Sequence, residues 1–255
     1  MRYRLTVLAT IVCMAAAGAV AEEGAFPVQE GFLSIDYATE NFEVREEMGG
    51  VDLVYIAPGT LEQLGKYEGV MVDQPEVWIA GDSPYGGAKP DNLKAIADLI
   101  RDGLTERLIR GGYNVVETPG PNVVLLRIAL TDLYLKKKKR GLLAYTPIGA
   151  ATKLAADAVR DMLDKVDIVE MALQAEFIDS ETDEVLAAVI VKRGARKDKQ
   201  AGQKEVRMDF DEFSEVIAEY AARIRCRLDN GKLPKEEWVD CLDPGAREAA
   251  QAASL

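Results

Sequence analysis

The chain has 255 residues, of which 48% are hydrophobic, and it carries a formal net charge of −12 with no histidine. This length suffices to bury a hydrophobic core and favours one domain with tails over two full domains. The lack of histidine excludes His-based catalytic triads and His metal sites, and the negative charge argues against a nucleic-acid partner.

Residues 1–21 have the pattern of a secretory signal peptide. Two arginines precede the apolar run Leu5–Ala17, and the small residues Ala19 and Ala21 mark a cleavage site. The run is short for a membrane span, and acidic residues follow it at once, which argues against the alternative of an uncleaved anchor. Cys13 lies inside the run, and we expect it to be removed with the peptide. The pattern therefore predicts export to the periplasm.

The next part of the chain contains an acidic lead and the first regular elements. Residues 22–50 are acidic and interrupted by glycine, so we expect an extended N-terminal segment. Short apolar runs predict strands over Asp52–Ala57 and Val70–Ile79, and an internal proline predicts a break in the second run. The apolar periodicity that starts at Pro90 predicts a helix that ends at the Gly111–Gly112 pair.

Alternating strand and helix patterns continue to the last helix. We predict strands over Tyr113–Glu117 and Asn122–Leu135, a helix over Thr152–Val166, and a hairpin of strands over Ile168–Ile178 and Val185–Lys192. Apolar and polar residues alternate in Ile168–Ile178, which predicts one packed and one solvated face, as in an antiparallel sheet. The last helix begins at Asp209, where Glu212 completes a capping-box pattern. The elements together predict a single α+β domain over residues 51–230, with a mainly antiparallel sheet and helices packed on one face.

Two cysteines, Cys226 and Cys241, remain after removal of the signal peptide. An oxidising compartment favours a disulfide between them, and a loop of about 15 residues contributes roughly 3 kcal/mol in the chain-entropy model. The alternative, a redox pair, lacks the close spacing of a Cys-x-x-Cys motif. Residues 231–255 are therefore expected to form a disulfide-closed loop and a disordered C-terminal tail.

Three patterns resemble catalytic or ligand-binding motifs and depart from them. Gly59–Lys66 resembles a phosphate-binding loop, but Tyr67 stands where Ser or Thr is required, so a short helical turn is favoured. Asp179, Glu181 and Asp183 have the spacing of a calcium loop without its glycine and final glutamate, which favours a solvated hairpin turn over the alternative of a weak, exposed calcium contact. No serine lies in a nucleophile-elbow pattern. We predict no catalytic residue, no metal site and no cofactor.

A basic run followed by apolar residues is the most polarised feature of the chain. The run comprises Lys136, Lys137, Lys138, Lys139 and Arg140, and the apolar side chains after it include Leu142, Leu143 and Tyr145. Such a basic segment, residues 136–148, would bind anionic lipid with about 1 kcal/mol per charge, or would contact a partner protein. The alternative is a solvated strand end, since lysine discourages edge-to-edge pairing of strands.

Stretches spread over the chain resemble the bacterial family called domain of unknown function 3313. They are Gly31–Tyr37, Leu53–Pro58, Lys66–Asp73, Glu76–Trp78, Pro90–Leu93, Leu126–Asp132 and Glu176–Leu186. The resemblance implies an exported envelope protein of unassigned activity and supplies no catalytic residues. It also implies that Gly31–Tyr37 belongs to the domain. Members are often lipoproteins, a pattern from which this chain departs at Cys13.

Three functional hypotheses follow from these observations. The first is a non-enzymatic periplasmic binding module whose partner is an envelope protein or surface component. The second is a peripheral membrane protein that docks on anionic lipid through the basic segment. The third is a histidine-free hydrolase that uses two carboxylates across a cleft.

Overall fold

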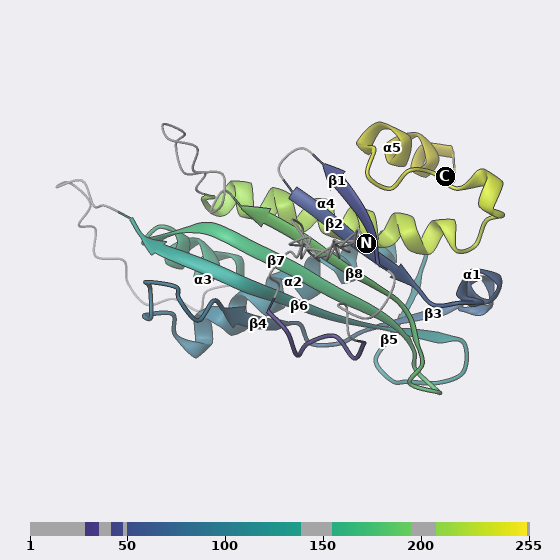
Figure 1. Ribbon diagram of the computed structural model, residues 1–255, viewed down its shortest axis with the longest axis horizontal. Helices are drawn as coiled ribbons and strands as arrows, with labels where there is room; N and C mark the ends of the chain where they lie inside the picture. Colours follow the sequence, from purple (N-terminus) through teal and green to yellow (C-terminus); the bar gives the residue numbers. More distant parts are fainter. Residues whose placement is uncertain (1–28, 36–41, 48–49, 139–154, 195–207, 254–255) are drawn as a thin grey trace, which may run out of the picture.

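The computed structural model describes residues 29–35, 42–47, 50–138, 155–194 and 208–253, and it shows helices packed against a β-sheet (Figure 1). The strands are β1 (Glu43–Glu47), β2 (Gly50–Ile56), β3 (Gly69–Val72), β4 (Glu76–Ile79), β5 (Asn114–Val116), β6 (Val123–Lys137), β7 (Val166–Asp179) and β8 (Val185–Gly194). The helices are α1 (Thr60–Gln63), α2 (Pro90–Arg110), α3 (Ala155–Leu163), α4 (Phe210–Asn230) and α5 (Pro244–Ala253), and the 3-10 turns are η1 (Leu64–Lys66) and η2 (Lys235–Glu237).

The described strands form one mixed sheet. Its order is β1–β2–β8–β7–β6–β3–β5, and β4 pairs with β6. The four pairings from β1 to β6 are antiparallel, whereas β3 pairs in parallel with β5 and β6, and β4 pairs in parallel with β6. The fold class α+β is confirmed, but the expectation of a mainly antiparallel sheet is wrong. Helix α2 connects β4 to β5. This long connection allows β5 to run parallel to its partner β3.

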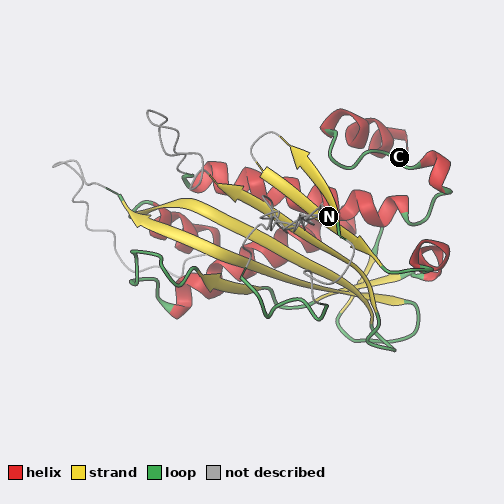
Figure 2. Ribbon diagram, viewed as in Figure 1, coloured by secondary structure: helices red, strands yellow, loops and turns green. Residues whose placement is uncertain are grey.

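Helices α2, α3 and α4 lie on one face of the sheet (Figure 2). The predicted helix after Pro90 is confirmed, and so is the capping box at Asp209, whose carboxylate accepts the Glu212 amide at 3.0 Å. In the core, Leu104 of α2 and Ile217 of α4 pack against Leu173 of β7. These contacts hold α2 and α4 side by side.

Strand β7 is buried along its whole length, so the predicted solvated face is wrong. Its polar residues point away from the helices but are paired: Glu176 accepts from Arg127 at 2.8 Å, and Glu170 lies 3.1 Å from Lys192. Ser34 Oγ donates to Glu176 at 3.0 Å, so residues 29–35 dock on this face. Alternation identifies the two faces of a strand but does not reveal what covers the polar one.

The N-terminal segment therefore differs from the extended lead expected for residues 22–50. Residues 29–35 contact the sheet, as the family resemblance implies, and residues 43–47 form the edge strand β1. Residues 1–28 lie outside the described part, so the signal peptide and the cleavage site at Ala19 and Ala21 stay predictions. Within the described residues, no helix has the length and apolarity needed to cross a bilayer.

The predicted disulfide between Cys226 and Cys241 is present and ties the C-terminal segment to α4. The expected disordered tail is wrong, because Pro244–Ala253 forms helix α5. Proline at the first turn is compatible with a helix start, and alanine has the highest helix propensity. The carboxylate of Asp243 accepts the Gly245 amide at 2.9 Å, as a helix cap does.

Candidate functional site

The basic segment is only partly described. Lys136 and Lys137 end β6, and the positions from Lys139 onward, including Arg140, Leu142, Leu143 and Tyr145, lie outside the described residues. Lys136 Nζ lies 5.6 Å from the Tyr134 ring centre, and Lys138 Nζ lies 3.8 Å from Asp167. The described part of the segment thus has contacts within the protein itself.

The two motif-like loops have structural roles. Gly59–Lys66 forms the short helical turns α1 and η1, as predicted. Asp179 accepts a hydrogen bond from the Tyr67 hydroxyl at 2.7 Å and lies 3.2 Å from Lys66 Nζ. Burial alone would raise the pKa of Asp179, but the hydrogen bonds from Tyr67 and the Glu181 amide outweigh it and lower that pKa to about 2. Among the described residues, no cluster of metal-binding side chains occurs.

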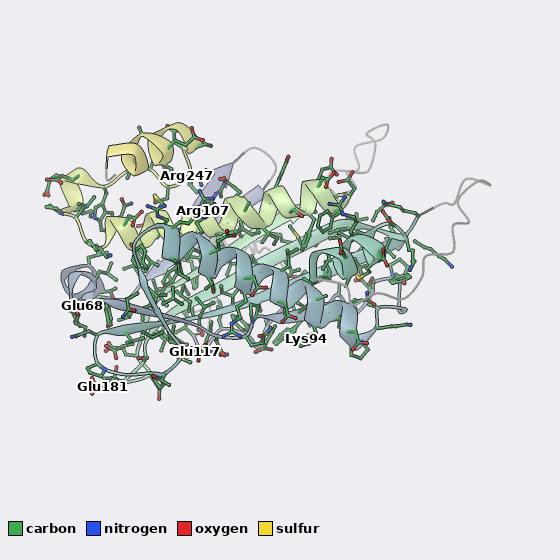
Figure 3. All side chains as sticks on the ribbon, turned by 180° about the vertical axis from the view of Figure 1, so that it is seen from behind. Glu68, Lys94, Arg107, Glu117, Glu181 and Arg247 are labelled. Carbon is green, nitrogen blue, oxygen red and sulfur yellow. A yellow bond between two sulfur atoms is a disulfide. The ribbon has the colours of Figure 1, made fainter. Side chains whose placement is uncertain are left out.

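A groove of about 380 Å³ lies between α2 and α4. Its lining comprises Leu99, Gly103, Glu106, Arg107, Arg110, Ser214, Ile217, Ala218, Ala221 and Arg225. Arg247 of α5 adjoins it, and Figure 3 shows Arg247 next to Arg107. We call this feature the arginine groove. Its volume exceeds that of a second cavity of about 130 Å³ in the described part of the chain.

Helical spacing places the groove residues on facing surfaces. On α2, Gly103, Arg107 and Arg110 are four and three residues apart, so they share one side of the helix. On α4, Ala221 and Arg225 are four residues apart and face α2. The small side chains leave the space that the guanidinium groups border.

A glycine at the end of α2 permits the position of Arg225. A Cβ atom at Gly111 would lie only 2.5 Å from Arg225 Nε and 2.9 Å from Arg225 Cζ. Any larger residue at this position would displace the guanidinium group. Gly111 therefore positions one wall of the groove.

The groove region contains more positive than negative charge. Its lining carries three arginines, Arg107, Arg110 and Arg225, and one carboxylate, Glu106, and Arg247 of α5 lies close to Arg107. Glu219 serves two arginines, at 2.9 Å from Arg223 Nε and 2.7 Å from Arg247 Nη2. The groove lining therefore has a local excess of positive charge in a chain of net charge −12.

Three guanidinium nitrogens here are buried without a hydrogen-bond partner among the described residues. They are Nε of Arg107, Nε of Arg225 and Nη1 of Arg247. Arg225 Nε lies 3.4 Å from Asp229, within ion-pair distance but without hydrogen-bond geometry. Arg247 is only 4% exposed, so water does not replace the missing acceptors readily. Unpaired buried donors are costly, and an oxyanion is the group that satisfies several of them at once.

Titration behaviour agrees with this geometry. Burial lowers the pKa of Arg107, and the positive charges of Arg225 and Arg247 lower it further. Burial alone would raise the pKa of Glu219, but hydrogen bonds from Arg223 and Arg247 lower it, so this carboxylate is ionised near neutral pH. The neighbouring positive charges around Arg107 thus repel one another, which disfavours further positive charge in the groove.

The groove lining carries more hydrogen-bond donors than acceptors. Glu106 is the one carboxylate in its lining, whereas glycoside hydrolysis needs two across a cleft. The hydroxyl of Ser214 donates to the Phe210 carbonyl at 2.8 Å, so no adjacent base activates it. Arginine does not deprotonate near neutral pH and acts as a donor only.

Sequence reasoning missed this groove because its arginines come from three elements. Arg107 and Arg225 have no local motif around them, and Arg247 lies in the tail that we expected to be disordered. The available signal was the spacing of Arg107 and Arg110 in the last turn of a predicted helix. The consecutive basic residues of the segment 136–148 formed a clearer charge pattern in the sequence, so that segment was predicted as the contact site.

Comparisons with known proteins place the chain in a family. The model of the family "Protein of unknown function (DUF3313)" matches residues 29–224. No curated protein sequence matches the chain. Among solved structures, the PelC dodecamer from Paraburkholderia phytofirmans is 12% identical, with a TM-score of 0.36 and coverage of 70% of this chain and 96% of that chain. A single-residue variant of that dodecamer is 14% identical, with a TM-score of 0.33 and coverage of 66% and 92%. Since the family model spans most of its length, this chain belongs to the DUF3313 family of proteins of unknown function.

Proposed function

We propose that this protein is an exported, non-enzymatic binding module of the cell envelope that holds an anionic group of another envelope component in the arginine groove. The observation that carries the proposal is the convergence of Arg107, Arg225 and Arg247, each with a buried nitrogen that lacks an acceptor. The planar guanidinium fork suits carboxylate and phosphate groups, which accept several hydrogen bonds at once.

The charge of the rest of the protein supports selectivity. With a net charge of −12, most of the surface repels anions, so binding concentrates where arginines outnumber carboxylates. Membrane docking through the basic segment receives less support, because Lys136 and Lys138 have contacts inside the protein. Sedimentation with anionic liposomes at low and high salt distinguishes membrane docking from anion binding in the groove. Membrane docking predicts salt-sensitive binding to the liposomes that charge reversal at Lys137 weakens.

Calorimetric titration of the purified protein with citrate and with inorganic phosphate tests the proposal. Each lost charge-assisted hydrogen bond costs about 1.5–3 kcal/mol, so Arg107→Gln and Arg247→Gln should each weaken binding about tenfold or more. Arg101→Gln is the matched control, because Arg101 is an exposed arginine of α2 outside the groove. Gly111→Ala changes no charge and should also weaken binding, by displacing Arg225.

Two outcomes would contradict the proposal. One is the absence of saturable anion binding at low ionic strength. The other is an equal loss of anion affinity in Arg101→Gln and Arg247→Gln, which would indicate general electrostatic attraction of the anion without a specific site. In cells, a photo-crosslinking residue at Ala218, an exposed groove position, should capture an envelope component that a crosslinker at Gly65 does not.

A further inference from the structure

The arginine groove has two unlike ends. The two helices that form it run in the same direction, because Arg225 of α4 lies beside Gly111, which directly follows α2. In Figure 3, α2 runs from Lys94 toward Arg107. The groove therefore extends from the arginines back toward the starts of both helices, over about 16 Å for the stretch from Ser214 to Arg225.

The arginines occupy only one of these ends. The lining toward the helix starts is small or apolar and consists of Leu99, Gly103, Ile217, Ala218 and Ala221, with Ser214 at the far end. Gly103 and Ala218 are exposed, so a ligand can reach this stretch. A ligand that fills the groove thus meets cations at one end and apolar surface along most of the remaining length.

The buried donors determine where the anionic group of such a ligand lies. Arg247 is 4% exposed and donates through Nη2 to Glu219 at 2.7 Å, and its Nη1 has no acceptor among the described residues. Nε of Arg107 and Nε of Arg225 also lack acceptors there. A carboxylate has two oxygens that accept several such hydrogen bonds. The anionic group therefore belongs at the arginine end, and the rest of the ligand extends toward Ser214.

Ser214 distinguishes a ligand that contains amide groups from a hydrocarbon chain. Its hydroxyl donates to the Phe210 carbonyl at 2.8 Å, so toward a ligand its oxygen can only accept. An acyl chain has no donor and would place methylene groups against this oxygen. A polypeptide has an N–H at every residue except proline, and roughly five extended residues span 16 Å. The groove therefore matches the end of a polypeptide chain in both length and hydrogen bonding.

We propose that the arginine groove binds the C-terminal end of a partner polypeptide whose last residue is apolar, an inference that rests on the anion binding proposed above. The terminal carboxylate accepts from the arginines, and the last side chain lies against Gly103 and Ala221, one helical turn before Arg107 and Arg225. An amide further back in the partner donates to Ser214. Capture of a C-terminal carboxylate is a recurring mode of peptide recognition.

Calorimetric titration with short peptides tests this inference. N-acetyl-trialanyl-leucine should bind at least tenfold more tightly than N-acetyl-trialanyl-glycine, because the leucine side chain buries apolar surface. The leucinamide form of the first peptide should bind at least tenfold more weakly than the acid, since it lacks the charged carboxylate. Sodium hexanoate represents the acyl alternative and should bind more weakly than the leucine peptide, because it offers Ser214 no donor.

Two groove variants and one control make the test specific. Gly103→Leu fills the apolar stretch and should bring the ratio of leucine to glycine peptide affinity close to one. Gly120→Leu is the matched control, because Gly120 lies outside the groove and an added Cβ at either glycine has no atom within 4 Å. Ser214→Ala should weaken binding of the leucine peptide several-fold, and more than that of hexanoate. Thermal unfolding verifies that each variant is folded.

Two outcomes would overturn this inference. One is equal affinity for the leucine and glycine peptides, and the other is hexanoate binding as tight as that of the leucine peptide. Citrate binding, measured in parallel, separates these failures from failure of the proposed function. If citrate binds and the leucine preference is absent, the anion site stands and the peptide assignment is wrong. If neither citrate nor any peptide binds, the proposed function is wrong as well.

Discussion

Replacement of either partner in the buried Arg127–Glu176 pair gives a sharp test of how residues 29–35 are held on the sheet. The Glu176 side chain is fully buried, whereas Arg127 is 29% exposed. Glu176 accepts from Arg127 Nη1 at 2.8 Å and from both the amide and the hydroxyl of Ser34. Removal of Glu176 therefore leaves a partly exposed arginine, whereas removal of Arg127 leaves a fully buried carboxylate.

This asymmetry sets the expected magnitudes. Breaking a buried ion pair by removing one partner costs about 3–5 kcal/mol. Glu176→Ala leaves an arginine that regains water, so we expect about 3 kcal/mol of lost unfolding free energy. Arg127→Ala leaves a fully buried carboxylate with only Ser34 as donor, so we expect a loss near 5 kcal/mol. Replacement of both by leucine should recover most of the loss.

Denaturant unfolding, followed by tryptophan fluorescence, measures these differences. Trp78 lies 6.2 Å from Phe32 between ring centres, so its emission also reports release of the N-terminal segment. The predicted order of stability is wild type, then Glu176→Ala, then Arg127→Ala. A loss below about 1 kcal/mol for Arg127→Ala would refute the reasoning, since it would mean that the carboxylate does not need this partner.

Three further predictions concern other parts of the fold. Replacement of Cys226 and Cys241 by alanine should cost roughly 3 kcal/mol in chemical denaturation and also weaken citrate binding, because the disulfide ties the segment that carries Arg247. Asp179 has a pKa lowered from 3.8 to about 2, so its contribution to stability is present above about pH 4 and lost as the pH falls toward 2; Asp179→Asn should flatten the acid limb of a stability profile in this window. Gly103→Ala should increase the free energy of unfolding by about 0.5–1 kcal/mol and so raise the melting temperature. Gly103 is inside helix α2, and a Cβ atom added there would have no atom within 4 Å.

Helix boundaries that depend on residues close together in the sequence could be predicted. The start of α2 at Pro90 and the capping box of α4 at Asp209 depend on neighbouring residues, and both are confirmed. The pairing of β3 with β6 depends on contacts between residues about 50 positions apart, such as Val70 with Val124, and no local pattern encodes its parallel direction. The burial of Glu176 likewise depends on Ser34, which is 142 positions away.

The same distinction explains the candidate site. The disulfide could be predicted, because the chain contains only two cysteines outside the predicted signal peptide. The arginine groove could not, because Arg107, Arg225 and Arg247 meet only after α2, α4 and the C-terminal segment have packed. Each of these arginines, taken alone in the sequence, is indistinguishable from a solvated surface cation.

The most direct test of anion recognition observes the arginine side chains themselves. In an NMR titration of the protein with citrate, the Nε–H resonances of Arg107 and Arg225 report the two groove nitrogens that lack acceptors. Binding in the groove predicts saturable shifts of both resonances, with the Nε–H resonance of Arg101 unchanged. Unchanged groove resonances, or equal shifts in all three arginines, would contradict the central claim.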